Sequence, residues 1–158
     1  MFSRKPSQPV KSWQLIFLGI IIVSSIALSL YYRHWPKIKI KINEQTYSVL
    51  LANNTRHHFI GLSNRKDLGK YDGMLFVFAN RVQHTFVMRN MLFPIDIVWL
   101  NKGEIVDIAP NIQPEPGKNE ASLTPYFARL PSDMVLELVA GTVAKNGLKI
   151  GDKLEILD

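Results

Sequence analysis

Hydrophobic and polar positions divide the chain into an apolar N-terminal run and a longer part in which short apolar segments alternate with turn residues. The run WQLIFLGIIIVSSIALSLYY, residues 13–32, contains no charged side chain. A helix of about 20 residues extends about 30 Å, which matches the hydrocarbon core of a bilayer. Trp13 at one end and Tyr31, Tyr32 and Trp35 at the other suit the two membrane interfaces. The pattern predicts a transmembrane helix.

The rest of the chain carries mostly strand patterns. KIKIKIN, residues 37–43, alternates lysine with isoleucine, which predicts a half-buried strand near a sheet edge. Further strands are expected at TYSVLLA (46–52), GMLFVF (73–78), QHTFVMRN (83–90), IDIVWL (95–100), IVDIA (105–109), MVLELVA (134–140) and KLEIL (153–157). We predict a mainly β fold, α+β with one or two short helices, forming a compact single-sheet or barrel-like domain after the transmembrane helix.

Helix and loop signals fill the remaining segments. NNTRHHFIGL, residues 53–62, begins with capping residues and predicts a short helix that ends near Gly61. GTVAKNGLKIGD, residues 141–152, predicts a short helix or turn. Residues 110–125 hold four prolines and no periodicity, which indicates an ordered flap or a mobile loop.

The net charge of +6 is informative because of where the charged residues lie along the chain. The first 41 residues hold seven of the 19 basic residues and none of the 13 acidic ones, so the remainder carries 12 basic and 13 acidic residues. A DNA-binding domain carries its positive patch on the folded part. We therefore expect no nucleic-acid partner.

The apolar run also predicts a cellular location. We divide the chain into a short basic segment (1–12), a transmembrane helix or uncleaved signal anchor (13–32) and a β-rich domain (36–158). A short basic leader before a hydrophobic run is the export pattern. We expect a single-pass protein of the cytoplasmic membrane whose C-terminal domain faces the periplasmic or extracellular side. Cleavage after ALS, residues 27–29, is the alternative, but the run is longer than a usual signal peptide core.

The succession GLSNRKDL, DGMLFVF, HTFVMRNMLFPIDIVWL, IVDIAPNIQP and MVLELVAGTVAKNGLKIGD resembles the DUF192 family of bacterial and archaeal proteins from about residue 38 to the C-terminus. The resemblance implies one compact, mainly β domain, often behind a signal or anchor segment, and it supplies no activity. The family often has a cysteine pair in the loop at 110–125, which is absent here. Phe86-Val87-Met88 more often reads Phe-Trp-Met, and Asp72 is usually glutamate.

Polar side chains inside the apolar stretch 84–100 are candidates for a site. On a strand His84, Met88 and Asn90 would share one face. Histidine and methionine suggest copper, but His84 and Met88 would be about 13 Å apart along a strand, too far to bind one ion. We therefore predict no metal and no cofactor. The candidate binding surface consists of His84, Met88, Asn90, Asp96, Arg65 and Asp72, next to the proline-rich loop.

Asp96 stands between Ile95 and Ile97, where an unpaired carboxylate would be costly to bury. It could lie at a strand end facing water. It could accept hydrogen bonds from backbone amides or Arg65, or it could pair with His84 in a cleft. These three alternatives remain open from the sequence.

Two functions from different classes fit these residues. The first is a non-catalytic, membrane-tethered binding or accessory module for an envelope polymer or a protein partner. The second is an envelope hydrolase that acts on a polymer, with His84 as base and Asp96 as its orienting group. No G-x-S-x-G, H-E-x-x-H or phosphate-binding glycine motif is present, and Ser63 is the best nucleophile candidate. We therefore favour the binding module, and the enzyme question stays open.

Overall fold

The computed structural model describes residues 11–157 of the 158-residue chain. These residues form two compact units, one ending at Trp35 and one beginning at Pro36. The predicted basic segment 1–12 lies almost wholly outside the described residues.

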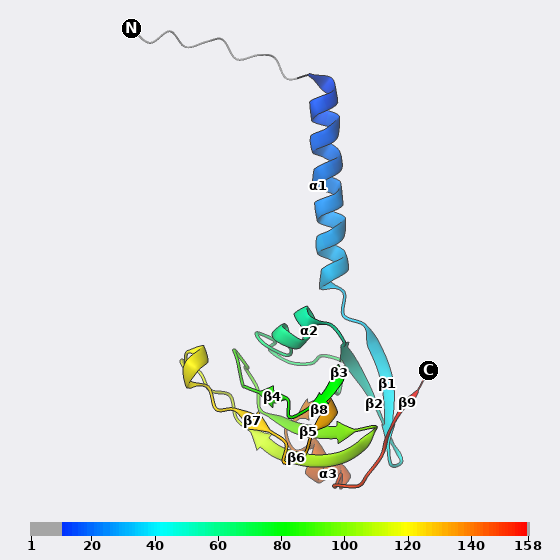
Figure 1. The fold of residues 1–158 in the computed structure, drawn as a ribbon, viewed down its shortest axis with the longest axis vertical. Coiled ribbons are helices and arrows are strands. Elements are labelled where there is room, and N and C mark those ends of the chain that lie inside the picture. The colour runs from blue at the N-terminus through cyan, green and yellow to red at the C-terminus, as the bar shows by residue number, and fades with distance from the viewer. Residues whose placement is uncertain (1–10, 158) are drawn as a thin grey trace. The chain divides into compact units, whose positions relative to one another are not determined.

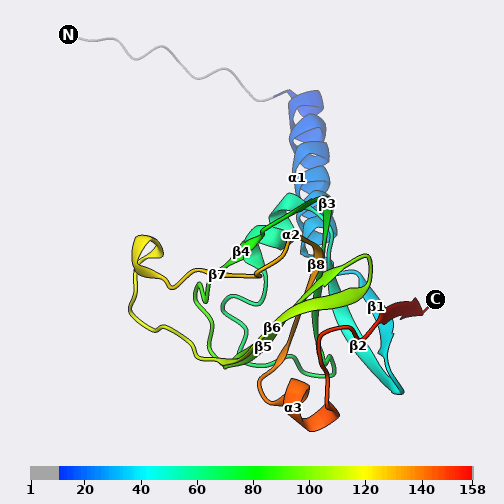
Figure 2. The ribbon, with the colours of Figure 1, turned by 60° about the horizontal axis from the view of Figure 1, so that its bottom comes forward.

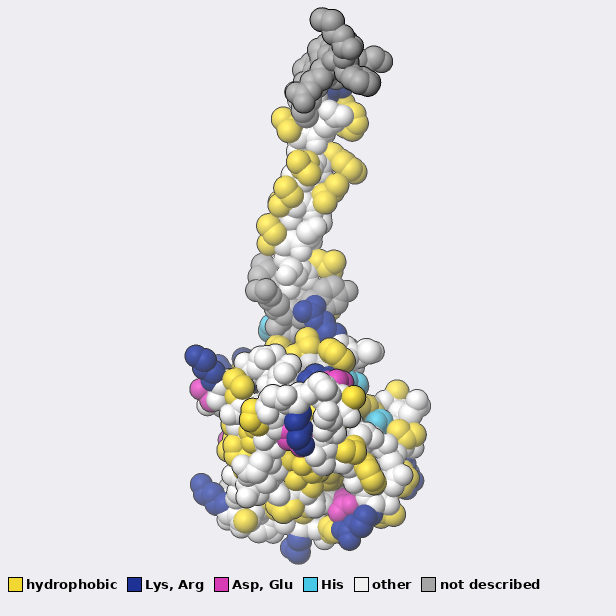
Figure 3. Space-filling model, turned by 90° about the vertical axis from the view of Figure 1, so that its left-hand side faces the viewer, with side chains coloured by type: hydrophobic (Ala, Val, Ile, Leu, Met, Phe, Trp, Pro, Cys, Tyr) yellow, Lys and Arg dark blue, Asp and Glu magenta, His cyan; other side chains and the backbone are white. Residues whose placement is uncertain are grey.

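The first unit is one long helix, α1 (Ser12–Arg33). Its window Ser12–Ser29 has a mean hydropathy of 1.9 and none of it is buried, so by length and composition it could cross a membrane. Hydrophobic side chains line the face of α1 seen in Figure 3. A signal sequence would meet the same criteria, so the helix suggests a signal anchor or a signal peptide.

The second unit is built on a seven-stranded sheet with the order β6-β5-β8-β3-β2-β1-β9. The strands and short helices, in chain order, are β1 (Lys37–Ile42), β2 (Gln45–Ala52), α2 (Thr55–Ile60), β3 (Gly73–Val82), β4 (Thr85–Phe86), β5 (Ile95–Asn101), β6 (Glu104–Ile112), η1 (Glu120–Ser122), β7 (Tyr126–Phe127), β8 (Ser132–Val139), α3 (Thr142–Asn146) and β9 (Leu154–Leu157). The pair β2–β3 is parallel, and the other neighbours are antiparallel. The mainly β prediction is confirmed.

The sheet curves into a half-barrel around one hydrophobic core (Figure 1). An isolated β-bridge between Glu104 and Lys153 joins the start of β6 to the residue directly before β9. The inward positions of the strands, together with α3, supply the core: Ile40, Ile42, Tyr47, Val49, Leu75, Val98, Leu100, Ile105, Leu136, Leu138, Val143, Leu148 and Leu154. Period-two alternation in each strand therefore selects this inner face.

The opposite face of the sheet is also buried. Register places Met74 of β3 and Ile97 of β5 on either side of Glu137 of β8, and all three are buried. The neighbouring residues Phe76 and Trp99 on this outer face are buried as well. Segments 53–72, 83–94 and 113–131 surround this side of the domain, and β4 and β7 lie side by side as a separate two-stranded sheet (Figure 2).

Local signals explain the helix and turn positions. Asn54 caps α2 by accepting a hydrogen bond from the His57 amide (2.9 Å), and Gly61 ends the helix with φ of 50°. Lys102 and Gly103 both have positive φ and form the tight turn between β5 and β6. The predicted helix ending near Gly61 is confirmed.

One expectation about the elements needs correction, and the structure adds detail to two others. Strand structure within 83–90 is limited to Thr85–Phe86, because the chain turns at Met88–Met91, where the Met91 amide bonds the Met88 carbonyl (3.3 Å). Strand β1 is one position inside the edge, because β9 pairs with its outer side. The 110–125 segment includes the end of β6 and the short helix η1.

Candidate functional site

A pocket of about 360 Å³ lies on the outer face of the sheet. Residues of α2 and the following turn, the end of β3, the segment 84–91 and Glu137 of β8 line it. Ligand sites in proteins have volumes of about 300–1,000 Å³, so the pocket has the size for a small organic molecule.

Aromatic rings form a continuous wall of the pocket. His84 stacks on Phe78 with ring centroids 3.6 Å apart, and the His58 ring lies tilted to Phe78 with centroids 4.4 Å apart. Phe76 meets Phe86 edge to face at 5.0 Å. Such contacts fix the ring orientations and make this wall of the pocket largely apolar.

The hydrogen bonds of the two histidines define their tautomers. His58 Nε2 lies 3.0 Å from the carbonyl oxygens of both Ala52 and Val77. His84 Nε2 lies 3.0 Å from the carbonyl oxygen of Asn80. A carbonyl oxygen only accepts, so Nε2 carries the proton in both rings. Nδ1 of each neutral ring is then a hydrogen-bond acceptor.

Glu137 is the most unusual residue of the pocket. Glu137 is only 6% exposed, and its Oε2 atom has no hydrogen-bond partner among the described residues. Burial raises the pKa of Glu137 to about 8, because the apolar surroundings disfavour the charged form. A buried, unpartnered carboxyl group in a pocket is a candidate functional group.

Two contacts fix the rim of the pocket. Arg89 forms a bidentate ion pair with Glu120 of η1, and its remaining terminal nitrogen donates to the Phe59 carbonyl (2.9 Å). The ion pair raises the pKa of Arg89 and lowers the pKa of Glu120. The Ser63 hydroxyl donates to the Arg89 carbonyl (2.7 Å), so the hydrogen of this candidate nucleophile is directed to a backbone oxygen.

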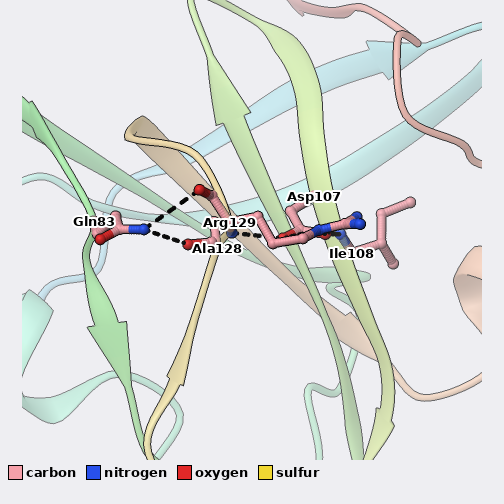
Figure 4. A network of polar contacts seen from close by, with 5 residues as sticks. All are labelled: Gln83, Asp107, Ile108, Ala128 and Arg129. Carbon is pink, nitrogen blue, oxygen red and sulfur yellow. Dashed lines mark hydrogen bonds and ion pairs between the residues drawn. The ribbon is translucent and has the colours of Figure 1, made fainter.

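A second network holds the outer wall (Figure 4). Asp107 of β6 pairs with the Arg129 guanidinium (2.7 Å) and accepts from the Arg129 amide (2.7 Å). The Gln83 side-chain amide donates to the Ala128 carbonyl (3.1 Å). These bonds follow directly on β7, which pairs Phe127 with Thr85 and Tyr126 with Phe86. The network therefore positions β4, which supplies two residues of the pocket lining.

Asp96 lies on the inner face of the sheet and is fully buried. Its Oδ1 accepts from the amides of Asn111 (2.8 Å) and Gly141 (3.2 Å), and Oδ2 accepts from the amide of Val143 (2.8 Å). Of the three alternatives, the geometry matches bonding to backbone amides, at the start of α3. Neither His84 nor Arg65 bonds to Asp96, so the alternative in which Asp96 pairs with His84 in a cleft is not formed.

The structure disperses the candidate surface. His84 lines the pocket, whereas Met88 is buried with 1% exposure. Asn90 is exposed in a turn with φ of 50°, and its carbonyl accepts from the Asn64 amide (2.8 Å). Arg65 is half-buried and outside the pocket lining. Asp72 is exposed and accepts from the Ser48 amide (2.7 Å), which ties it to β2.

Other pocket residues were missed by the sequence patterns. His57 and His58 resemble surface residues of a short helix, but His57 is buried and His58 enters the aromatic wall. Burial lowers the pKa of His57. The available signal was the capping asparagine before the two histidines, because Asn54 holds His57 in place through the His57 amide.

Residues 11–157 contain no group of three or more histidine or acidic side chains arranged to hold a metal ion. The pocket itself brings together two histidines and one carboxyl group within an aromatic wall. This arrangement can bind an organic molecule through contacts with the aromatic rings and through the hydrogen-bond acceptors of the lining.

Two solved structures are similar to this chain. A protein of unknown function from Novosphingobium aromaticivorans is 30% identical, covers 77% of this chain and 84% of its own, and has a TM-score of 0.64. A Sinorhizobium meliloti protein proposed to be a transcription regulator is 28% identical, covers 77% of this chain and 95% of its own, and has a TM-score of 0.67. No curated protein matches the chain.

The family model described as "Uncharacterized ACR" matches residues 38–156, which is nearly all of the second unit. This match confirms the resemblance drawn from the sequence, and the chain belongs to the DUF192 family.

Proposed function

We propose that this protein is a membrane-tethered, extracytoplasmic binding module whose aromatic pocket holds a small organic ligand. One observation carries the proposal: the buried carboxyl group of Glu137, without a partner for Oε2, lies in an aromatic pocket of about 360 Å³. A buried polar group without a partner costs free energy in a fold, and a ligand that bonds to it offsets that cost.

The rest of the lining supports binding over catalysis. Catalytic hydrolysis of a glycan needs two carboxyl groups about 5–10 Å apart, and Glu137 is the one acidic residue in the lining. Ser63 donates its proton to a backbone carbonyl and not to a histidine, so it lacks the activating base that a nucleophile needs.

The alternative, an envelope hydrolase with His84 as base and Asp96 as its orienting group, has less support. Asp96 bonds to three backbone amides on the inner face, whereas His84 stacks on Phe78 in the outer pocket. A screen of polymeric envelope substrates with the purified chain tests this alternative. Turnover that is lost in His84→Ala and Asp96→Asn would favour the enzyme.

Ligand binding is tested with the full-length chain in a nonionic detergent. A library of small aromatic and alicyclic compounds is screened by thermal shift and by ligand-observed NMR. Binders should lose affinity in Phe78→Ala, which removes the ring between the two histidines, and should keep it in Phe127→Ala, whose exposed side chain is outside the lining. A library without a single Phe78-dependent binder would overturn the binding function.

Tethering and orientation need a separate test. The chain has no cysteine, so Lys66→Cys adds a single thiol at an exposed position of the second unit. We expect a membrane-impermeant maleimide to label Lys66→Cys in intact spheroplasts, whereas Ser7→Cys should need permeabilised cells. Reversed labelling would contradict the extracytoplasmic location, and recovery of uncleaved chain from the soluble fraction would contradict the tether.

The kind of partner follows from charge. The Sinorhizobium meliloti relative is proposed to be a transcription regulator, but in this chain the residues after 41 carry 12 basic and 13 acidic side chains. Nucleic-acid binding needs a positive surface on the folded domain. A small ligand, free or as part of an envelope polymer, fits the pocket better.

A further inference from the structure

We propose that the pocket selects organic amines, with the ammonium group of the ligand at Glu137 and its carbon skeleton between the aromatic rings. This inference rests on the proposed function, because it names the ligand class of the same pocket. Its basis is that the donors of the pocket lining are already hydrogen-bonded, whereas acceptors remain free.

The strong donors of the lining are already used. Nε2–H of His58 is directed to the carbonyl oxygens of Ala52 and Val77, and Nε2–H of His84 to that of Asn80. The Ser63 hydroxyl bonds the Arg89 carbonyl. The hydroxyls of Thr55 and Thr85 can donate or accept, so they do not set the polarity of the pocket.

Arg89 adds little positive charge to the pocket. Both carboxylate oxygens of Glu120 bond its guanidinium, and Phe59 provides a third acceptor. The guanidinium carbon also lies 4.3 Å from the centroid of the Phe59 ring. An anionic ligand would therefore have to compete with Glu120 for this arginine.

The polar groups of the lining that remain free are acceptors once Glu137 is ionised. In the Nε2–H tautomer, Nδ1 of His58 and Nδ1 of His84 are acceptors, and no described residue bonds to Oε2 of Glu137. Glu137 is 6% exposed and lies on β8 between Met74 and Ile97, so no basic residue flanks it on the neighbouring strands. A ligand that brings donors and a positive charge satisfies all of these groups.

The aromatic wall favours the same ligand class. Phe76, Phe78 and Phe86 line the pocket together with Glu137. A cation near an aromatic face is stabilised by the ring quadrupole, more strongly where water is excluded. An anion gains nothing from these faces, and a neutral molecule gains only apolar contact.

Amine binding also predicts a proton release. Glu137, with its pKa at about 8, is mostly protonated at pH 7 in the free protein. An ammonium ion beside it favours the carboxylate. Binding at pH 7 should therefore release up to about one proton from Glu137 to the buffer.

The experiment uses calorimetry on the full-length chain in a nonionic detergent at pH 7. The probes are 2-phenylethylamine, the neutral 2-phenylethanol and the anionic 3-phenylpropanoate. Titrations in two buffers with different ionisation heats measure the protons released. We expect the amine to bind at least about tenfold more tightly than the alcohol, as for a charge-assisted hydrogen bond, and the anion to bind most weakly.

Glu137→Gln should remove this preference while Glu104→Gln, an exposed glutamate at the start of β6, should keep it. Equal affinity for amine and alcohol in the wild type, or no proton release with the amine, would overturn the amine assignment. If that happens while Phe78→Ala still weakens all probes, the binding pocket itself stands. Failure of all three probes to bind the wild type would count against the pocket as well.

Discussion

Asp96 and Glu137 are buried acids on neighbouring strands, but they project from opposite faces of the same sheet. Asp96 is paired with Leu138 and Glu137 with Ile97 in the β5–β8 ladder. Three backbone amides bond Asp96, whereas Oε2 of Glu137 has no partner among the described residues. The first acid is part of the scaffold, and the second is the group at which we propose that a ligand binds.

Asp96→Asn should destabilise the domain. The amide side chain presents only one acceptor oxygen, so at least one of the amides of Asn111, Gly141 and Val143 loses its partner. We expect a loss of about 1.5–3 kcal/mol, the range for hydrogen bonds to a charged group, and a melting temperature lower by several degrees. Chemical and thermal unfolding followed by circular dichroism measure this.

Asp133→Asn is the control for that substitution. Asp133 also accepts from a backbone amide, that of Lys102, but in a solvent-exposed contact at the start of β8. It should change stability by less than Asp96→Asn. An Asp96→Asn protein that melts like the wild type would refute a structural role for Asp96.

Glu137→Gln should stabilise the unliganded protein at alkaline pH. The folded-state pKa of about 8 lies above the ordinary value of 4.5, so the folded protein holds more protons than the unfolded chain between these values. Stability from this group is therefore greatest below pH 4.5 and falls as pH rises towards 8. Each pKa unit corresponds to about 1.4 kcal/mol, so the loss amounts to a few kcal/mol.

The measurement is urea unfolding of the wild type and Glu137→Gln from pH 4 to pH 8. We expect the two proteins to have similar stability at the acid end and the variant to be more stable at the alkaline end. Parallel pH profiles would show that Glu137 ionises freely in the folded protein.

Arg129→Gln should loosen the pocket wall without unfolding the sheet. Arg129 lowers the pKa of Asp107, and both its backbone amide and its side chain bond this acid. The substitution removes the side-chain bonds that lie next to β7. Amides of Thr85–Phe86 and Tyr126–Phe127 should exchange faster by hydrogen exchange, while those of β3 and β8 stay protected.

Arg81→Gln provides the comparison, because Arg81 is exposed at the end of β3. The same loosening should occur in the wild type as pH falls through the lowered pKa of Asp107, since a depressed acid pKa means that stability is lost on protonation. Unchanged exchange in β4 and β7 would show that backbone pairing alone holds the wall.

Gly73→Ala should be among the most damaging substitutions in the domain. A Cβ atom at Gly73 would lie 2.2 Å from the carbonyl oxygen of Glu137 and 2.9 Å from a methyl carbon of Leu138. Strands β3 and β8 would have to separate at the position that holds Glu137. We expect a loss of stability larger than that of Gly69→Ala, which has open space and only a positive φ, and probe binding at the pocket should weaken with it.

The scaffold was predictable because its signals are local. Alternation in residues 37–42, the cap at Asn54 and the turn at Lys102–Gly103 each lie within a few residues of what they specify. Asp96 could be recognised as an acid that needs partners, but its partners come from segments 15 to 47 positions away. Partners so far away in the sequence cannot be predicted from a local pattern of residues.

Glu137 was not predictable for a related reason. In MVLELVA the glutamate occupies the outward position of an alternating strand, which in most sheets faces water. Here loops cover the outer face, and their paths depend on long-range contacts such as those of Arg89 with Glu120 and Asp107 with Arg129. Loop packing, and not strand periodicity, decides that this carboxyl group is buried.

Strand β4, which lines part of the pocket, pairs with β7 in a two-stranded sheet that is separate from the seven-stranded sheet. Only two residue pairs join these strands, and side-chain clamps secure them to the larger sheet. In the proposed binding function, movement of β4 and β7 would break these few bonds and leave the seven-stranded sheet intact. The strength of these bonds would then set how long a ligand stays in the pocket.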